Sequence, residues 1–103
     1  MIYVCSPFRG DTENNVKFAR ECCKKVLNAG LIPYAPHLFF PQFLNDNDPI
    51  ERELGLHAGL SVMRYCDELW VFGETITQGM QAEIEYAHKT GKGVKYLGQG
   101  CNL

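Results

Sequence analysis

The residue with the clearest chemical potential in this sequence is Glu83, an acid on the inner side of a predicted helix. Apolar residues recur at helical spacing from Gln78 to Thr90, which indicates an amphipathic helix. On a wheel at roughly 100° per residue with Met80 as origin, Ile84 falls at about 40° and Glu83 at about 300°. Glu83 therefore borders the core-facing stripe, where a carboxylate is costly unless it is paired or has a task. It is either the carboxylate that a site at this position needs, or the structural partner of a backbone N–H or a basic side chain.

Two loops carry groups that can bind an anion. The first runs from Ser6 to Asp11 and offers a hydroxyl, the Arg9 guanidinium group and, at Gly10, room for close backbone approach. Arginine binds phosphate and carboxylate groups through paired hydrogen bonds. The second loop, Gly73 to Gln78, leads into the first turn of the helix that carries Glu83, where free N–H groups and the helix dipole favour an anion. A solvated loop arginine is the alternative interpretation.

The elements that must position these groups alternate along the chain. Runs rich in β-branched and aromatic residues predict strands over Met1–Cys5, Leu31–Ala35, Glu68–Gly73 and Val94–Leu97. Helical periodicity predicts helices over Asn14–Asn28, Ile50–Cys66 and Gln78–Thr90. This βαβαβαβ pattern predicts a flavodoxin-like or Rossmann-like three-layer α/β domain, with a parallel sheet of about four strands in the order 2-1-3-4. Ligands bind such sheets where the strand order reverses, which is where the two loops above meet.

Each of the first two helices shows an apolar stripe. In the first helix the stripe consists of Val16, Ala19, Cys23, Val26 and Leu27, and in the second it consists of Ile50, Leu54, Ala58 and Ser61. Asp11 or Thr12 is a suitable cap for the start of the first helix. From Gly98 to Leu103 we predict a polar tail without a regular element.

Several further residues have both a structural and a functional interpretation. Tyr3, on the first strand, either packs in the core or donates its hydroxyl to a carboxylate in the pocket. His37 lies in the long irregular stretch from Pro36 to Pro49, which is typical of a lid or an interface; it is a lid residue or a turn residue. Asp67 precedes the third strand, at the end of the sheet away from the site, and is expected to be a cap or turn residue.

Composition excludes several classes of protein. With 103 residues and 46% apolar residues, the chain is sufficient for one domain with one core. The net charge of −2 and the lack of a basic run argue against a nucleic-acid partner. No apolar run approaches the roughly 20 residues of a membrane span, and no signal peptide is recognisable, so a cytoplasmic location is expected.

The cysteines indicate neither a disulfide framework nor a metal site. They are odd in number and lack the spacing of metal ligands, which favours reduced thiols in the cytosol and no metal. The five are Cys5, Cys22, Cys23, Cys66 and Cys101. Gly73 and Gly79 are too sparse for a dinucleotide-binding fingerprint, and no cofactor is expected.

Three stretches together resemble the nucleoside 2-deoxyribosyltransferase-like superfamily, and more closely its small uncharacterised bacterial and phage members. They are Ile2-Tyr3-Val4, Ser6-Pro7-Phe8-Arg9-Gly10 and Gly79-Met80-Gln81-Ala82-Glu83-Ile84-Glu85-Tyr86-Ala87. The resemblance implies that residues 1–103 form one domain of this kind. It also implies that Glu83 is the nucleophile and that Tyr3 orients it. Ser6, Arg9 and Gly10 resemble the phosphate-holding loop of the related 2'-deoxynucleoside 5'-monophosphate N-glycosidases.

The implied function is that of an N-glycosidase or deoxyribosyltransferase acting on 2'-deoxynucleosides or their 5'-monophosphates. The alternative is a non-catalytic nucleotide-binding or sensing module. A homo-oligomer, dimeric or higher, is expected because the superfamily completes its sites with neighbouring subunits. The expected substrate-binding residues are Ser6, Phe8, Arg9, Gly10, His37, Gly73, Glu74, Gly79 and Met80.

The sequence departs from the superfamily pattern in two places. Glu85 stands where the pattern has glycine. The segment Gly73 to Thr77 lacks the aspartate that handles the base in the transferases, and Glu74 is the remaining acid there. The general acid is therefore unassigned.

Overall fold

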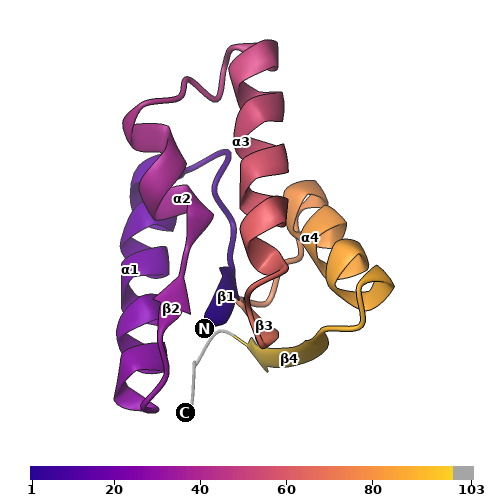
Figure 1. Cartoon of the computed structure of the whole chain (residues 1–103). Coiled ribbons are helices and arrows are strands. Elements are labelled where there is room, and N and C mark those ends of the chain that lie inside the picture. The colour runs from indigo at the N-terminus through magenta and orange to yellow at the C-terminus, as the bar shows by residue number, and fades with distance from the viewer. Residues whose placement is uncertain (99–103) are drawn as a thin grey trace.

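The computed structural model describes residues 1–98 and contains a four-stranded parallel sheet between helices (Figure 1). The strands lie in the order β2-β1-β3-β4, which confirms the predicted fold class and strand order. The elements in chain order are β1 (Ile2–Cys5), α1 (Thr12–Asn28), β2 (Pro33–Tyr34), α2 (Pro36–Phe39), η1 (Phe40–Gln42), α3 (Pro49–Met63), β3 (Glu68–Phe72), α4 (Gln78–Lys89) and β4 (Gly93–Gly98).

Alternation along β1 divides the core into two layers. Ile2 and Val4 point to the face covered by α1, where they pack with Cys22, Trp70 and Phe72 among others. Tyr3 and Cys5 point to the opposite face, where the buried cluster includes Met63 of α3 and Met80, Ile84 and Ala87 of α4. Successive strand residues face opposite sides of a sheet, so the same four-residue strand serves both layers. Tyr3 and Cys5 are thereby directed at the helix that carries Glu83.

Side-chain caps fix where the helices begin. The Asp11 carboxylate accepts from the Asn14 N–H at 3.4 Å, so α1 begins at Thr12, two residues before the predicted start. The Thr77 hydroxyl accepts from the Met80 N–H at 3.2 Å and defines the first turn of α4. This cap holds the N-terminus of α4 at the edge of the sheet where the site was predicted.

The stretch Pro36 to Pro49 is more ordered than the sequence suggests. It contains α2 and η1, and its phenylalanines Phe39, Phe40 and Phe43 pack edge-to-face with ring centroids 5.1 to 5.9 Å apart. Proline suits the first turn of a helix because it needs no N–H donor there. A long aromatic-rich segment therefore forms two short helical turns instead of the expected irregular loop.

The predicted apolar stripes are partly wrong. In α1 the buried residues are Ala19, Cys22 and Val26, while Leu27 is 53% exposed. In α3, Ile50 is 74% and Leu54 57% exposed, because the N-terminal half of this helix extends beyond the strands (Figure 1). The buried residues of α3 are instead Gly59 and Met63, which lie near its C-terminal end.

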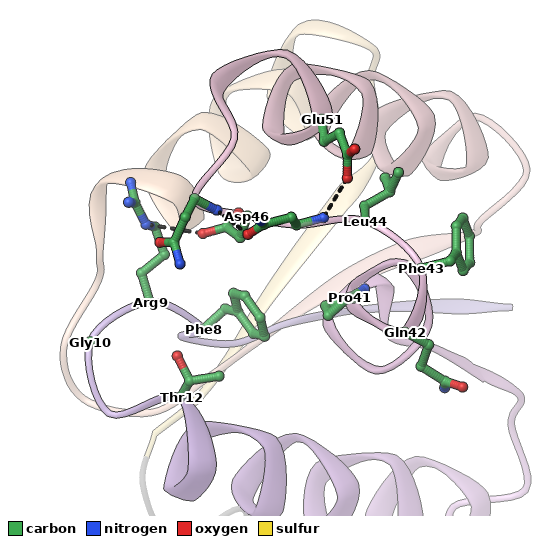
Figure 2. A pocket seen from close by; sticks show the side chains of 12 residues that line it. Phe8, Arg9, Gly10, Thr12, Pro41, Gln42, Phe43, Leu44, Asp46 and Glu51 are labelled. Atoms are coloured by element: carbon green, nitrogen blue, oxygen red, sulfur yellow. Dashed lines mark hydrogen bonds and ion pairs between the residues drawn. The ribbon is translucent and has the colours of Figure 1, made fainter.

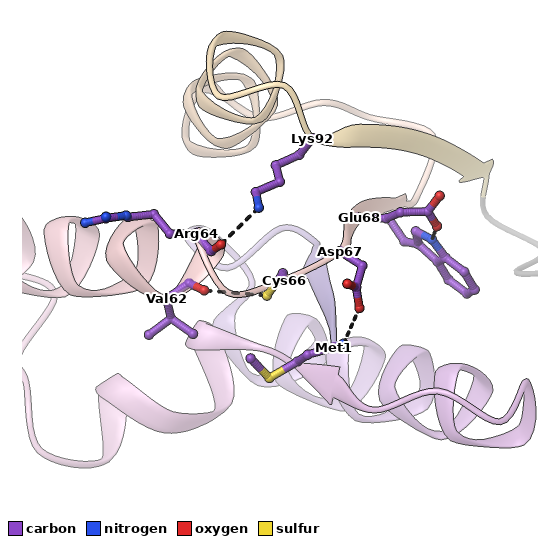
Figure 3. Close-up of polar contacts among 8 residues, drawn as sticks. Met1, Val62, Arg64, Cys66, Asp67, Glu68 and Lys92 are labelled. Atoms are coloured by element: carbon purple, nitrogen blue, oxygen red, sulfur yellow. Dashed lines mark hydrogen bonds and ion pairs between the residues drawn. The ribbon is translucent and has the colours of Figure 1, made fainter.

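Polar contacts tie the elements together at the amino ends of the strands, away from the predicted site (Figure 3). The Met1 ammonium group binds Asp67 Oδ2 at 2.7 Å, and this contact holds the pKa of the Asp67 carboxyl below its usual value. Lys92 Nζ donates to the Arg64 carbonyl at 2.9 Å. Asp67 thus lies where the sequence indicated, but as the partner of the terminal ammonium group.

Two sequence predictions concern the end of the chain and its relation to membranes. Gly98 belongs to β4 and not to a tail; the rest of the predicted tail, with Cys101, lies outside the described residues. Within residues 1–98, no helix has the length and apolar character needed to cross a membrane.

Candidate functional site

Glu83 lies on the side of α4 that faces the core, and its side chain is only 4% exposed. The Tyr3 hydroxyl donates a hydrogen bond to Glu83 Oε2, and Cys5 Sγ lies 3.3 Å from Glu83 Oε1. Both donors come from β1, because residues two apart on a strand point to the same face. The Glu83 carboxylate is therefore held at both oxygens, by two side chains on the same face of β1.

Burial controls the electrostatics of this cluster. It raises the pKa of Glu83 from 4.5 to about 7, while the hydrogen bonds from Tyr3 and Cys5 act in the opposite direction. Burial and the nearby Glu83 carboxylate also raise the pKa of the Tyr3 hydroxyl and of the Cys5 thiol well above their ordinary values. Tyr3 and Cys5 therefore stay protonated donors, and Glu83 is the group that titrates near neutral pH.

A cleft of about 700 Å³ opens in front of Glu83 at the carboxyl ends of the strands. Its walls come from β1, the β1–α1 loop, the α2–η1 segment, one face of α3 and the first turns of α4. The predicted site residues on these walls are Tyr3, Phe8, Arg9, Gly10, His37, Gly79, Met80 and Glu83. The volume falls within the several hundred cubic ångströms typical of small-molecule sites.

The remaining predicted site residues are not among those lining the cleft. Ser6 is buried, and its hydroxyl has no hydrogen-bond partner within residues 1–98. Gly73 serves the turn after β3, where its φ of 100° requires the left-handed region that glycine tolerates. Glu74 is exposed on the same turn. The structure thus brings the first predicted loop to the cleft but not the segment that immediately follows β3.

Arg9 is already engaged by an internal carboxylate. Its Nε lies 3.1 Å from Asp46 Oδ2, across the hollow shown in Figure 2. This hollow of about 680 Å³ shares Phe8, Arg9 and Asp46 with the cleft in front of Glu83. The Asn45 N–H donates to Glu51 Oε1 at 2.6 Å and holds the segment that carries Asp46 against α3 (Figure 2). Asp46 thus occupies the Nε side of the Arg9 guanidinium group, while the Arg9 side chain is 53% exposed.

His37 is a neutral, packed residue of the cleft wall. Its ring stacks on Phe8 with centroids 4.9 Å apart and an interplanar angle of 16°. Burial lowers the pKa of His37 to about 4, although Asp46 and a hydrogen bond with the Ser6 backbone act in the opposite direction. The imidazole is therefore uncharged at neutral pH, and the stacked pair offers an aromatic surface to a ligand.

The sequence analysis missed the contribution of α3. Gly59 approaches Tyr3 so closely that a Cβ there would lie 3.4 Å from the Tyr3 hydroxyl oxygen. One helical turn earlier, Gly55 also lines the cleft, as does Arg52 at its outer part. Two glycines at i and i+4 within a helix are unfavourable for helix stability, and this spacing was the available signal. The two glycines bring the backbone of α3 to the cleft, beside the side chains of Arg52 and Leu56.

Fold and site together define a three-layer α/β domain with a buried carboxylate at the strand-order reversal. The sequence model of one family, described as a domain of unknown function (DUF7768), matches residues 1–97, so the chain belongs to that family. No curated protein matches the chain.

Among solved structures, the chain resembles a 2-deoxyribosyltransferase from the psychrotolerant bacterium Bacillus psychrosaccharolyticus. The TM-score is 0.71 at 18% sequence identity, and the match covers 99% of this chain and 75% of that chain. That protein is described as a biocatalyst for nucleoside synthesis. The likeness establishes that this chain has the 2-deoxyribosyltransferase fold.

Proposed function

We propose that this protein cleaves the N-glycosidic bond of a 2'-deoxynucleoside or its 5'-monophosphate, with Glu83 as the nucleophile. The observation that carries the proposal is the Glu83 carboxylate, held at both oxygens and facing a cleft of about 700 Å³. The pKa of about 7 leaves a large fraction of this carboxylate ionised at neutral pH. It also makes the ionised form more basic than an ordinary glutamate, which favours bond formation to carbon.

In this mechanism Glu83 attacks C1' of the sugar through an oxocarbenium-like transition state and forms a covalent glycosyl-enzyme. The bond from C1' to the base nitrogen breaks, and the base leaves with its electron pair and takes up a proton. Water then releases the free sugar, or a second base accepts it. Glu74, the acid that the sequence offered as proton donor, is exposed and outside the cleft lining, so the proposal assigns no side chain to this proton.

Arg9 is the proposed partner of the sugar-phosphate end. It lies beside Gly10 at the mouth of the cleft, and the capped N-terminus of α4 at Thr77 to Gly79 lines the same space. A 5'-phosphate that binds Arg9 takes the place of Asp46. Phe8 and His37 supply the aromatic wall against which a planar base can stack.

The test is release of free base from a panel of deoxynucleosides and deoxynucleoside monophosphates. Wild-type protein is expected to release base, and Glu83→Gln is expected to abolish the release. Glu85→Gln is the matched control, because Glu85 lies on the exposed side of the same helix and accepts a hydrogen bond from the Gln81 side chain. Equal release by Glu83→Gln and wild type would contradict the assignment of the nucleophile.

A second candidate function, a non-catalytic nucleotide-binding module, is favoured by one observation. The acids near the cleft other than Glu83 are engaged: Asp46 pairs with Arg9 and Glu51 accepts from Asn45. A thermal-shift screen with the same panel separates the two functions, since a ligand that binds the folded state raises the melting temperature. Stabilisation without base release would support binding alone.

We further propose that the chain works as a cytoplasmic homo-oligomer of the bacterial or phage branch, with residues 1–103 as its domain. The exposed Ile50 and Leu54 lie on the part of α3 that extends beyond the sheet, next to the cleft wall at Gly55. A second copy covering this face would deepen the cleft. Light scattering coupled to gel filtration tests this, and an Ile50→Glu, Leu54→Glu variant is expected to shift the mass to that of a monomer.

A further inference from the structure

Cys5 is part of the Glu83 cluster, but it is absent from the site residues that the sequence predicted, and the proposed mechanism gives it no step. Its side chain is fully buried, and its sulfur lies 3.3 Å from Glu83 Oε1 and 3.8 Å from the Met80 carbonyl oxygen. A thiol has one proton to donate. The contact with Glu83 is the shorter one and ends on an oxygen that becomes charged, so it is the stronger of the two when the carboxylate is ionised.

The two donors approach the carboxylate from different sides. Tyr3 and Glu83 line the cleft, whereas Cys5 does not and is 0% exposed. Tyr3 therefore holds Oε2 at the wall of the cleft, and Cys5 holds Oε1 from within the core. A carboxylate with one donor can rotate about its terminal torsion, which is broad for glutamate. A second donor on the other oxygen removes this freedom.

We propose that Cys5 is a positioning residue for Glu83, and that its thiol fixes the orientation of the carboxylate by donating a hydrogen bond to Oε1. Cys5 is not among the residues that line the cleft, so its role is to act through Glu83 and not on a substrate directly. The raised pKa of the thiol keeps the proton on sulfur, which makes Cys5 a donor and not a competing nucleophile. Sulfur is a weak donor, so it orients the carboxylate while withdrawing less negative charge from it than a hydroxyl would.

This inference rests on the proposed function only in naming Glu83 the nucleophile; the hydrogen bond itself is tested without turnover. The first measurement is the S–H stretching band in the infrared spectrum of the whole protein. The difference between wild type and Cys5→Ala isolates the band of Cys5 from those of the other thiols. Glu83→Gln is expected to shift this band to higher frequency, toward that of a thiol with a weaker acceptor. An unshifted band would overturn the proposal.

The second measurement is the titration of Glu83, followed by ¹³C NMR of the labelled side-chain carboxyl and assigned with Glu83→Gln. Loss of a donor in Cys5→Ala is expected to raise the midpoint by about half a pH unit, which is about threefold in proton affinity. Cys5→Ser, with a stronger hydroxyl donor, is expected to lower the midpoint below the wild-type value. Cys22→Ala, which removes a buried thiol on the opposite face of the sheet, is expected to leave it unchanged.

Equal midpoints for Glu83 in wild type, Cys5→Ala and Cys5→Ser would overturn the proposal. Circular dichroism shows whether each variant is folded. If Cys5→Ala is not folded, the decision falls to the S–H band of Cys5 in wild type and Glu83→Gln, and an unshifted band contradicts a donor role. Where wild type releases base, the acid limb of kcat is expected to move with the NMR midpoint while KM stays within twofold. Where wild type releases no base, the proposed function is wrong, but the S–H band and the Glu83 titration still test the role of Cys5.

Discussion

The Tyr3 hydroxyl donates a hydrogen bond to Glu83 Oε2 between residues that are 80 positions apart in the sequence. The first strand of the chain and its last helix are thus joined at the one acid that the core encloses among residues 1–98. The contact depends on parallel pairing of β1 with β3 and on α4 covering the face to which Tyr3 points. The same contact makes the ionisation of Glu83 sensitive to changes on β1.

Removal of the Tyr3 hydroxyl is predicted to destabilise the protein in a pH-dependent way. Tyr3→Phe leaves a buried, ionised oxygen without its strongest donor, and such a loss costs about 1–3 kcal/mol. The cost is expected at pH 8, where Glu83 is ionised, and is expected to shrink at pH 5, where Glu83 is protonated. Urea unfolding of wild type and Tyr3→Phe at pH 8 and at pH 5 measures the loss of stability at each pH. A loss of equal size at both would show that Tyr3 contributes by packing alone.

The free energy of unfolding is predicted to depend on pH through the ionisation of Glu83. The pKa of this residue is about 7 in the folded protein and near its ordinary 4.5 when unfolded, so the folded state binds the proton more tightly. Its contribution to stability is therefore fully present below pH 4.5 and is lost as the pH rises through 7, by about 3 kcal/mol in total.

Glu83→Gln is predicted to remove this decline and to be more stable than wild type at pH 8. The amide keeps an oxygen that can accept from Tyr3 and does not ionise, so the desolvation cost of the charge disappears. Thermal unfolding of both proteins from pH 4.5 to 8 measures the difference. Parallel curves over this range would contradict the raised pKa of Glu83. Glu85→Gln is the control and is expected to follow the wild-type curve.

The pair Arg9–Asp46 is predicted to gate binding of a 5'-phosphate. Asp46→Asn frees the Arg9 guanidinium group, so the affinity for deoxynucleoside monophosphates should rise while that for the matching deoxynucleosides stays within twofold. The cost in stability should stay below about 1 kcal/mol, because the two side chains are 53% and 34% exposed. Titration calorimetry with both ligand sets measures this, and Arg9→Gln is expected to remove the preference for the phosphate. Equal affinities in wild type and Asp46→Asn would argue that Arg9 binds no phosphate.

The two glycines of α3 are predicted to respond differently to an added methyl group. Gly55→Ala meets only the end of the Leu44 side chain, at 3.4 Å, and should stabilise the helix by up to about 1 kcal/mol. Gly59→Ala places its Cβ against the Tyr3 hydroxyl and Pro36 Cβ, at 3.4 and 3.5 Å. It should show less of this gain and should perturb the Glu83 titration. Urea unfolding and NMR of both variants test the prediction, and identical behaviour would mean that Gly59 has no bearing on Tyr3.

Sequence alone determined the order of the elements, the parallel sheet and the inward position of Glu83. These follow from local rules: the period of two along a strand places Tyr3 on one face, and the period of 3.6 along a helix places Glu83 near Met80 and Ile84. The switch-point rule then located the cleft beside Arg9 and Gly10. The periods need only residues that are close together in the chain, and the topology rules need only the order in which the elements follow one another.

The tertiary structure decided which neighbours these groups have. The contacts of Cys5 with Glu83 and of Arg9 with Asp46, and the approach of Gly59 to Tyr3, join elements that are far apart in the sequence. Periodicity shows that a helix face is apolar but not which element covers it, so the exposure of Ile50 and Leu54 on α3 was not predictable. Contact between distant segments depends on how the helices are placed over the sheet, and that placement is a property of the whole packed core.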